Sequence, residues 1–122
     1  MTEPLRLLVI DDDPLQLELL ERALSRDGFE VRGVDTLAAL RAEAARSAPD
    51  LVLVDVNLPD LEPEQVIQLV RDVARGARIV LYSAWEESKL RALVARAGAD
   101  AFLSKSESVL ALGPRLRELA GR

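Results

Sequence analysis

Residues 51–56 read LVLVDV, a run of aliphatic side chains interrupted only by Asp55. A second run of the same kind, LLVI, covers residues 7–10. Strands that are apolar on both faces are typical of parallel sheets that helices cover from both sides. We therefore predict that these two runs form central strands of an α/β sheet.

The same pattern continues along the whole chain. Strands are predicted at residues 5–10, 29–34, 51–56, 78–82 and 101–103, and each is followed by a segment with apolar residues at helical spacing, such as Leu17, Leu20 and Leu24. This alternation implies right-handed crossovers and a doubly wound parallel sheet, which we expect to form one domain over residues 1–122. The strand at 29–34 alternates polar and apolar residues and is predicted at an edge of the sheet.

Helix-boundary signals support this reading. Asp13 before Pro14 predicts an N-cap and a first-turn proline, and Gln16 is expected to complete a capping box with Asp13. Gly113-Pro114 interrupts the apolar stripe of the last helix. Either that helix kinks there or two short pieces abut.

Composition excludes several classes of function. The 122 residues carry a formal net charge of −5 and include neither cysteine nor histidine. Disulfides, thiolate metal sites and cysteine nucleophiles are therefore excluded, and the commonest general base is missing. The negative charge disfavours electrostatic binding to nucleic acid or acidic lipid. Because no apolar run approaches the ~18 residues of a membrane span, we expect a soluble, cytoplasmic protein.

Charged and hydroxyl side chains follow the predicted strands. Asp11 and Asp12 end the first strand, Asp55 the third, Ser83 the fourth and Lys105 the fifth. Open parallel sheets bind ligands beyond the carboxyl ends of their strands. If the first and third strands are neighbours, their carboxylates converge, and two carboxylates about 4 Å apart repel by roughly 4 kcal/mol near a protein surface. Such a cluster requires a cation.

Two cations are available to this cluster. Lys105 can supply a fixed positive charge, and a divalent ion is the alternative. Oxygen ligands without histidine or cysteine favour Mg²⁺ or Mn²⁺, and the backbone carbonyl of a nearby residue such as Asn57 can complete the coordination. The set suits phosphoryl transfer: Asp55 attacks phosphorus and forms an acyl phosphate, while Lys105 and Ser83 stabilise the phosphoryl oxygens.

These motifs resemble the receiver domain of two-component response regulators over nearly the whole chain. The matching pieces are LLVIDDDP at 7–14, LVLVDVNLPD at 51–60, IVLYSA at 79–84 and GADAFLSKS at 98–106. The resemblance implies a flavodoxin-like (βα)5 fold with strand order 2-1-3-4-5. It also implies a signalling switch that receives its phosphoryl group from a histidine kinase or phosphotransfer protein and turns over no external substrate.

The resemblance further implies a role for each motif residue. Asp55 matches the phosphoacceptor, Asp11 and Asp12 the acidic pair that holds Mg²⁺, and Asn57 the residue whose main-chain carbonyl ligates the metal. Ser83 matches the switch hydroxyl, and Lys105 matches the lysine of the family. Phe102 matches the aromatic residue whose rotamer changes with the position of that hydroxyl. Partners of such receivers contact the fourth helix, fifth strand and fifth helix.

Departures from the pattern leave alternatives open. Trp85 lies two residues past Ser83, where it either shields the acyl phosphate or only packs on the adjacent loop. A receiver-like interaction module that ignores phosphorylation is a second reading. A third is a Mg²⁺-dependent phosphohydrolase of the haloacid-dehalogenase type, suggested by Asp11 and Asp13 in a D-x-D pattern, although the fourth strand lacks the acidic pair of that family.

Overall fold

The computed structural model describes residues 3–59 and 61–121, in which strands and helices alternate. The elements are β1 (Arg6–Ile10), α1 (Pro14–Arg26), β2 (Glu30–Val34), α2 (Leu37–Arg46), β3 (Leu51–Asp55), α3 (Pro63–Val73), β4 (Arg78–Ser83), α4 (Glu87–Ala97), β5 (Ala101–Ser104), the 3-10 helix η1 (Val109–Ala111) and α5 (Leu112–Leu119). The predicted strands are confirmed to within one residue at each end. None of the described helices combines the length and hydropathy needed to cross a membrane.

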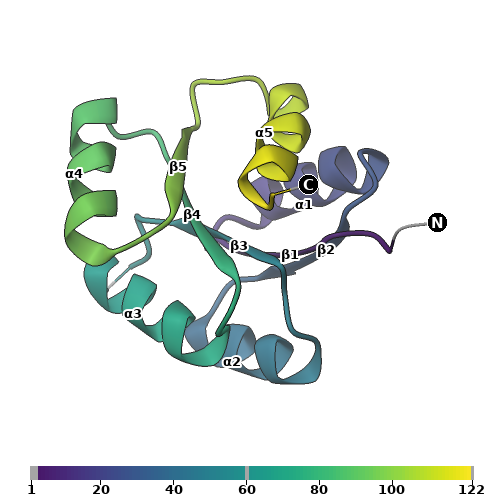
Figure 1. The fold of residues 1–122 in the computed structure, drawn as a ribbon, viewed down its shortest axis with the longest axis horizontal. Helices are drawn as coiled ribbons and strands as arrows, with labels where there is room; N and C mark the ends of the chain where they lie inside the picture. The colour runs from purple at the N-terminus through teal and green to yellow at the C-terminus, as the bar shows by residue number, and fades with distance from the viewer. Residues whose placement is uncertain (1–2, 60, 122) are drawn as a thin grey trace.

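The five strands form one parallel sheet in the order β2-β1-β3-β4-β5 (Figure 1). In its centre, Leu53 of β3 pairs with Val9 of β1 on one side and with Val80 of β4 on the other. The flavodoxin-like strand order is therefore confirmed, as is the placement of β2 at an edge. Since β1 and β3 are neighbours, their carboxyl ends lie next to each other.

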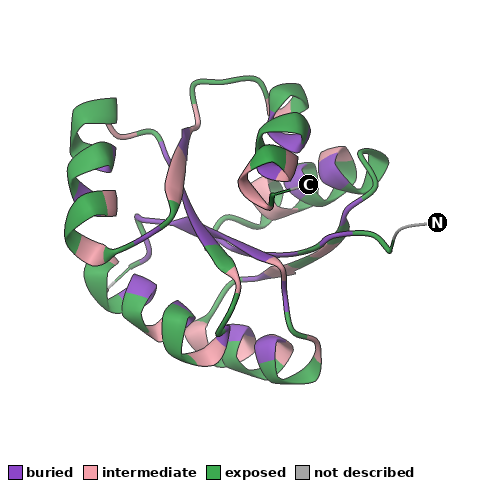
Figure 2. Ribbon diagram, viewed as in Figure 1, coloured by how far each residue is buried: buried purple, intermediate pink, exposed green. Residues whose placement is uncertain are grey.

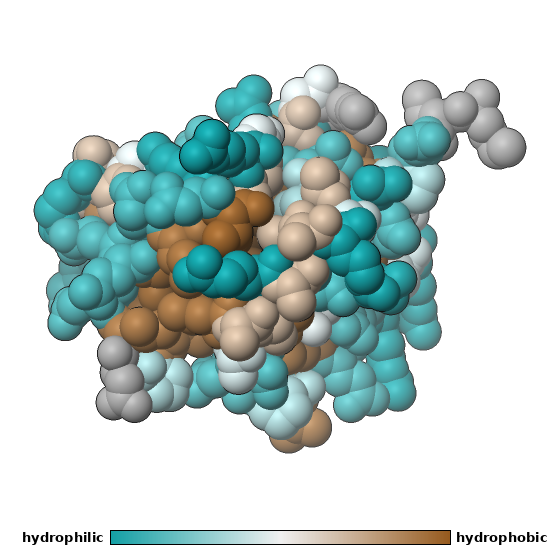
Figure 3. Space-filling view, turned by 90° about the horizontal axis from the view of Figure 1, so that it is seen from below, coloured by the Kyte–Doolittle hydropathy of each residue, from teal (hydrophilic) through white to brown (hydrophobic). Residues whose placement is uncertain are grey.

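Helices cover both faces of the sheet, as the apolar central strands predicted. Leu20 of α1 and Leu116 of α5 pack on one face, whereas Leu40 of α2, Val70 of α3 and Leu93 of α4 pack on the other. Figure 2 shows burial concentrated in the strands and on the inward sides of the helices. Seen from the α2–α3 side, a central apolar area is framed by hydrophilic side chains (Figure 3).

The start of α1 confirms one prediction and corrects another. Asp13 is the N-cap, and its side chain accepts a hydrogen bond from the backbone N–H of Leu15 at 3.0 Å. The expected capping box with Gln16 is wrong, because the backbone N–H of Asp13 instead donates to the carboxylate of Asp11 at 3.0 Å. The first helix is thus tied directly to a carboxylate at the end of β1.

The last helical stripe consists of two pieces, which settles the alternative at Gly113-Pro114. The 3-10 helix η1 ends at Ala111, and α5 begins at Leu112. Pro114 consequently lies in the first turn of α5, where a backbone N–H has no helical partner to lose.

Candidate functional site

Three carboxylates meet at the carboxyl ends of β1 and β3. Asp11 and Asp12 directly follow β1, and Asp55 is the last residue of β3. One oxygen from each side chain lies within 4.8 Å of the others. The structure thus brings together the acidic residues that strand adjacency predicted to converge.

Two of these carboxylates are withdrawn from solvent. Asp11 is 1% exposed and Asp55 is 4% exposed, whereas Asp12 lies at the surface. Asp11 Oδ1 accepts the hydrogen bond from Asp13, but its Oδ2 is buried and accepts none among the described residues. A buried, negatively charged oxygen without a donor is costly unless a cation lies near it.

Lys105 supplies one positive charge to the cluster. Its Nζ lies 3.5 Å from Oδ2 of Asp11 and 3.7 Å from Oδ1 of Asp55. The backbone N–H of Lys105 donates to the carbonyl oxygen of Ser83 at 2.8 Å, which fixes the start of this loop beside the end of β4. A single ammonium group therefore serves two buried carboxylates and leaves the cluster with excess negative charge.

Burial raises the pKa of Asp55 above the ordinary aspartate value of 3.8, because a charged carboxylate loses solvation there. The hydrogen bond from the backbone N–H of Asn57, 3.0 Å from Oδ1, opposes this rise in pKa. The negative charge of Asp11 adds to the rise, and Lys105 reduces it. The side chain with the predicted nucleophilic role is thus the one whose charge the surroundings penalise.

Ser83 and Asn57 are linked through Trp85. The fully buried Ser83 Oγ accepts a hydrogen bond from the backbone N–H of Trp85 at 3.0 Å. The indole Nε1–H of Trp85 donates to the side-chain oxygen of Asn57, also at 3.0 Å. The half-buried Trp85 packs against the core and also joins the loops after β3 and β4.

Phe102, the remaining residue that the resemblance singled out, lies apart from this linkage in β5. It is half-buried and packs against the core on the α2–α4 face. The guanidinium of Arg91 lies 5.9 Å from the centroid of its ring. Phe102 therefore contributes to the surface between α4 and β5.

Tyr82 is a site residue that the sequence analysis missed. It pairs with Asp55 in the register of β3 and β4, is 2% exposed, and its ring centroid lies 5.4 Å from Nζ of Lys105. Burial raises the pKa of Tyr82, and the charges of Asp11 and Glu107 add to this rise, while a hydrogen bond with Gln16 opposes it. The available signal was a tyrosine directly before Ser83 in an otherwise aliphatic strand.

The residues present fit a hard divalent cation. The cluster offers carboxylate oxygens from three residues, and one buried oxygen, Oδ2 of Asp11, lacks a hydrogen-bond donor. Oxygen donors of this kind, without sulfur or imidazole, match Mg²⁺ or Mn²⁺. Asp11, Asp12 and Asp55 are therefore the side chains that would hold such an ion.

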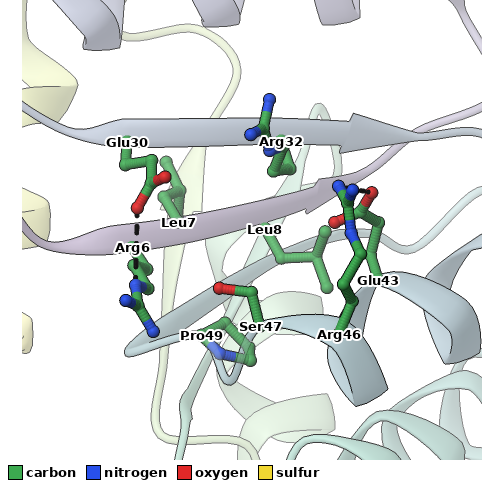
Figure 4. A pocket seen from close by; sticks show the side chains of 9 residues that line it. All are labelled: Arg6, Leu7, Leu8, Glu30, Arg32, Glu43, Arg46, Ser47 and Pro49. Atoms are coloured by element: carbon green, nitrogen blue, oxygen red, sulfur yellow. Dashed lines mark hydrogen bonds and ion pairs between the residues drawn. The ribbon is translucent and has the colours of Figure 1, made fainter.

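A different cavity lies at the opposite, amino edge of the sheet (Figure 4). It has a volume of about 190 Å³, and Leu8 and Pro49 contribute to its apolar lining. Its charged residues are Arg6, Glu30, Arg32, Glu43 and Arg46, of which four form two ion pairs, Arg6–Glu30 at 3.4 Å and Arg46–Glu43 at 2.7 Å. The carboxylate cluster and this cavity are separate features at opposite ends of the strands.

Comparison with known proteins agrees with the geometry. Residues 7–116 match the family model of the response regulator receiver domain. The chain is 36% identical over 123 residues to the transcriptional regulatory protein PrrA of Mycobacterium tuberculosis, covering 100% of this chain and 52% of PrrA. It is 38% identical over 111 residues to KdpE, the KDP operon transcriptional regulatory protein of Escherichia coli, covering 90% of this chain and 48% of KdpE. The chain thus spans about half the length of these curated relatives.

A solved structure shows the same fold along nearly the whole chain. The crystal structure of a putative response regulator from Chloroflexus aurantiacus superposes with a TM-score of 0.84 at 26% identity. The match covers 98% of this chain and 99% of that one.

Proposed function

Because the chain belongs to the response regulator receiver domain family, we propose that it is a phosphorylation-dependent switch of a two-component system, with Asp55 as the phosphoacceptor. The observation that carries this proposal is the placement of Asp55. Its buried carboxylate ends a central strand, lies within 4.8 Å of two further carboxylates and is 3.7 Å from the ammonium group of Lys105. A nucleophile and the charges that phosphoryl transfer requires are thus present at one point.

In the proposed reaction, a carboxylate oxygen of Asp55 attacks phosphorus and forms an acyl phosphate. The phosphorus–nitrogen bond of a phosphohistidine on the donor protein breaks, and its electron pair and a proton remain with the leaving imidazole. Asp55 attacks in its ionised form, so the chain needs no general base. Lys105 and Ser83 are proposed to neutralise and hydrogen-bond the transferred phosphoryl oxygens.

Mg²⁺ is the proposed cofactor, held by Asp11, Asp12, Asp55 and the main-chain carbonyl of Asn57. When bound, it supplies positive charge to phosphoryl oxygens. The carboxylates of Asp11 and Asp12 would hold that charge near Asp55, because all three side chains belong to one cluster. Lys105 remains the fixed positive charge that the chain itself provides.

A small phosphodonor tests this function without a kinase. Incubation with acetyl phosphate and Mg²⁺ is expected to add the mass of one phosphoryl group to the wild-type chain and none to Asp55→Asn. Asp50→Asn, which changes a carboxylate at the amino edge of the sheet, serves as the matched control and should still be modified. Absence of any mass gain would favour the phospho-independent interaction module, and turnover of generic phosphomonoesters the phosphohydrolase.

Partners are part of the proposal, since the chain spans about half of its curated relatives. The phosphodonor is proposed to be a histidine kinase or phosphotransfer protein, because the chain has no histidine of its own. The proposed output surface comprises α4, β5 and α5, where a cavity of about 400 Å³ is lined in part by Arg91, Phe102 and Arg115. We place this switch in the cytoplasm, in agreement with the absence of cysteine.

Trp85 is proposed to slow hydrolysis of the acyl phosphate, because its indole N–H is hydrogen-bonded to Asn57, two residues after Asp55. Trp85→Ala should release phosphate about three- to tenfold faster than the wild type, since losing one neutral hydrogen bond and the ring opens the loop. Trp85→Phe keeps a ring but not the indole N–H and should lie in between. Equal rates of phosphate release in all three proteins would refute this role.

A further inference from the structure

The Lys105 ammonium group lies between two carboxylates and an aromatic ring. The carboxylates are those of Asp11 and Asp55, at 3.5 Å and 3.7 Å from Nζ. The ring is that of Tyr82, whose centroid is 5.4 Å from Nζ. This distance is within the roughly 6 Å over which a cation is attracted to the face of an aromatic ring.

The ring itself is firmly placed. Tyr82 is 2% exposed and belongs to the core cluster that includes Val80, Leu103 and Leu20. Lys105, in contrast, is a long side chain with 25% of its surface exposed. Because a buried ring has few alternative positions, it restricts where the more exposed ammonium group rests.

The chemistry of an aromatic face suits this position. A π face attracts the ammonium charge without accepting its N–H bonds in the way that a carboxylate does, so these donors remain available for oxygens. Another carboxylate would deepen the excess of negative charge, and an aliphatic side chain would not attract the lysine. The preceding residues of β4, Ile79, Val80 and Leu81, are aliphatic, so the strand does not require an aromatic residue.

We propose that Tyr82 is a positioning residue for phosphoryl transfer, whose ring holds the Lys105 ammonium group beside the reacting carboxylate of Asp55. This inference rests on the proposed function of Asp55. In this role Tyr82 acts through Lys105, not by binding the phosphoryl group or a metal itself. The phenol hydroxyl is dispensable for this role, and the ring face is required.

The test compares initial rates of mass gain from acetyl phosphate at saturating Mg²⁺. Tyr82→Leu should react about three- to tenfold more slowly than the wild type, as loss of a partly buried cation–π contact implies. Tyr82→Phe should remain within about twofold of the wild type, because it keeps the ring. Val80→Ala, a packing change on the same face of β4, is the matched control and should also remain within about twofold.

Two further measurements separate positioning from general packing. In a Lys105→Met background, Tyr82→Leu should have no additional effect on the rate, since its action passes through the lysine. Mg²⁺ affinity, measured by calorimetry, should be nearly equal in the wild type and in Tyr82→Leu because the carboxylates are unchanged. If Tyr82→Leu loses its cooperative unfolding transition, Tyr82→Met provides the same comparison.

Each outcome is decisive. If the wild type gains no mass, the proposed function fails and this inference falls with it. If the wild type reacts but Tyr82→Leu is equally fast, only the positioning role is refuted. That role is also refuted if Val80→Ala is as slow as Tyr82→Leu, or if Tyr82→Phe is no faster than Tyr82→Leu.

Discussion

The two ends of the parallel strands hold their charges differently. At the carboxyl ends, here called the carboxyl edge, buried Asp11 and Asp55 share the ammonium group of Lys105. At the amino ends, the amino edge, each of two ion pairs joins one arginine to one glutamate. The Arg6–Glu30 pair is also much more exposed, with 48% and 46% of its two side chains accessible. Charge is balanced within each of these pairs. At the carboxyl edge, negative charge is in excess, and the carboxylates of Asp11 and Asp55 are buried away from water.

This difference distinguishes exposed charges, which change the free energy of folding little, from buried charges, which make folding less favourable. Exposed ion pairs contribute between zero and about 1 kcal/mol and are readily replaced. A buried carboxylate oxygen without a donor, such as Oδ2 of Asp11, is unfavourable in any soluble protein. The proposed cation beside Asp55 would offset this cost by neutralising the buried oxygen.

The largest expected effect on stability comes from removing Lys105. Without Mg²⁺, Lys105→Met should lower the free energy of unfolding by about 2 kcal/mol, because two buried carboxylates then lie next to each other without a positive charge. The loss stays below the full cost of breaking a buried ion pair because Lys105 is partly exposed. Arg46→Met at the amino edge should cost less than about 0.5 kcal/mol. Urea denaturation measures both, and equal losses would abolish the proposed difference between the edges.

Mg²⁺ should stabilise the carboxyl edge by a somewhat smaller amount. At tenfold excess over its dissociation constant, binding to the folded state alone adds about 1.4 kcal/mol, or roughly 5 °C in melting temperature. Asp12→Asn should melt higher than the wild type without metal, since one repelling charge is removed, and should respond less to Mg²⁺. Thermal unfolding with and without Mg²⁺ tests both statements, and flat responses in both proteins would contradict the cation site.

The pKa of Asp55 gives the same edge a characteristic pH dependence. Burial raises this pKa in the folded chain above 3.8, so the unfolded chain releases the proton first as the pH rises. Asp55 therefore contributes most stability below pH 3.8, and this contribution is lost as the pH rises through its folded pKa. Without Mg²⁺, the stability of the wild type relative to Asp55→Asn should fall and then level off. If the wild type instead became more stable relative to Asp55→Asn as the pH rises, the buried environment of Asp55 would be contradicted.

The sequence predicted the layout of the carboxyl edge because that layout depends on strand ends alone. Apolar runs located β1 and β3, and parallel pairing necessarily places Asp11 and Asp55 at the same edge. The position of Lys105 follows from the same rule applied to β5. Backbone topology was therefore sufficient to collect these charges.

The positions of strand ends do not predict contacts between side chains of different loops. The hydrogen bond from Trp85 to Asn57 and the position of Lys105 over Tyr82 depend on rotamers and loop paths, which have no period in the sequence. The expected partnership of Asp13 with Gln16 was wrong for a similar reason. A carboxylate two residues earlier, that of Asp11, reaches the same backbone N–H.

The smallest effect is expected at the amino edge, where the ion pair of Arg6 and Glu30 joins β1 to β2. Glu30→Gln should change the free energy of unfolding by less than about 0.5 kcal/mol, because both side chains are about half exposed and water replaces the lost partner. High salt should make the variant and the wild type indistinguishable, since it screens exposed charges. A loss comparable to that of Lys105→Met, or one that persists in high salt, would mean that the amino edge also holds charge at a cost and that its cavity requires a functional explanation of its own.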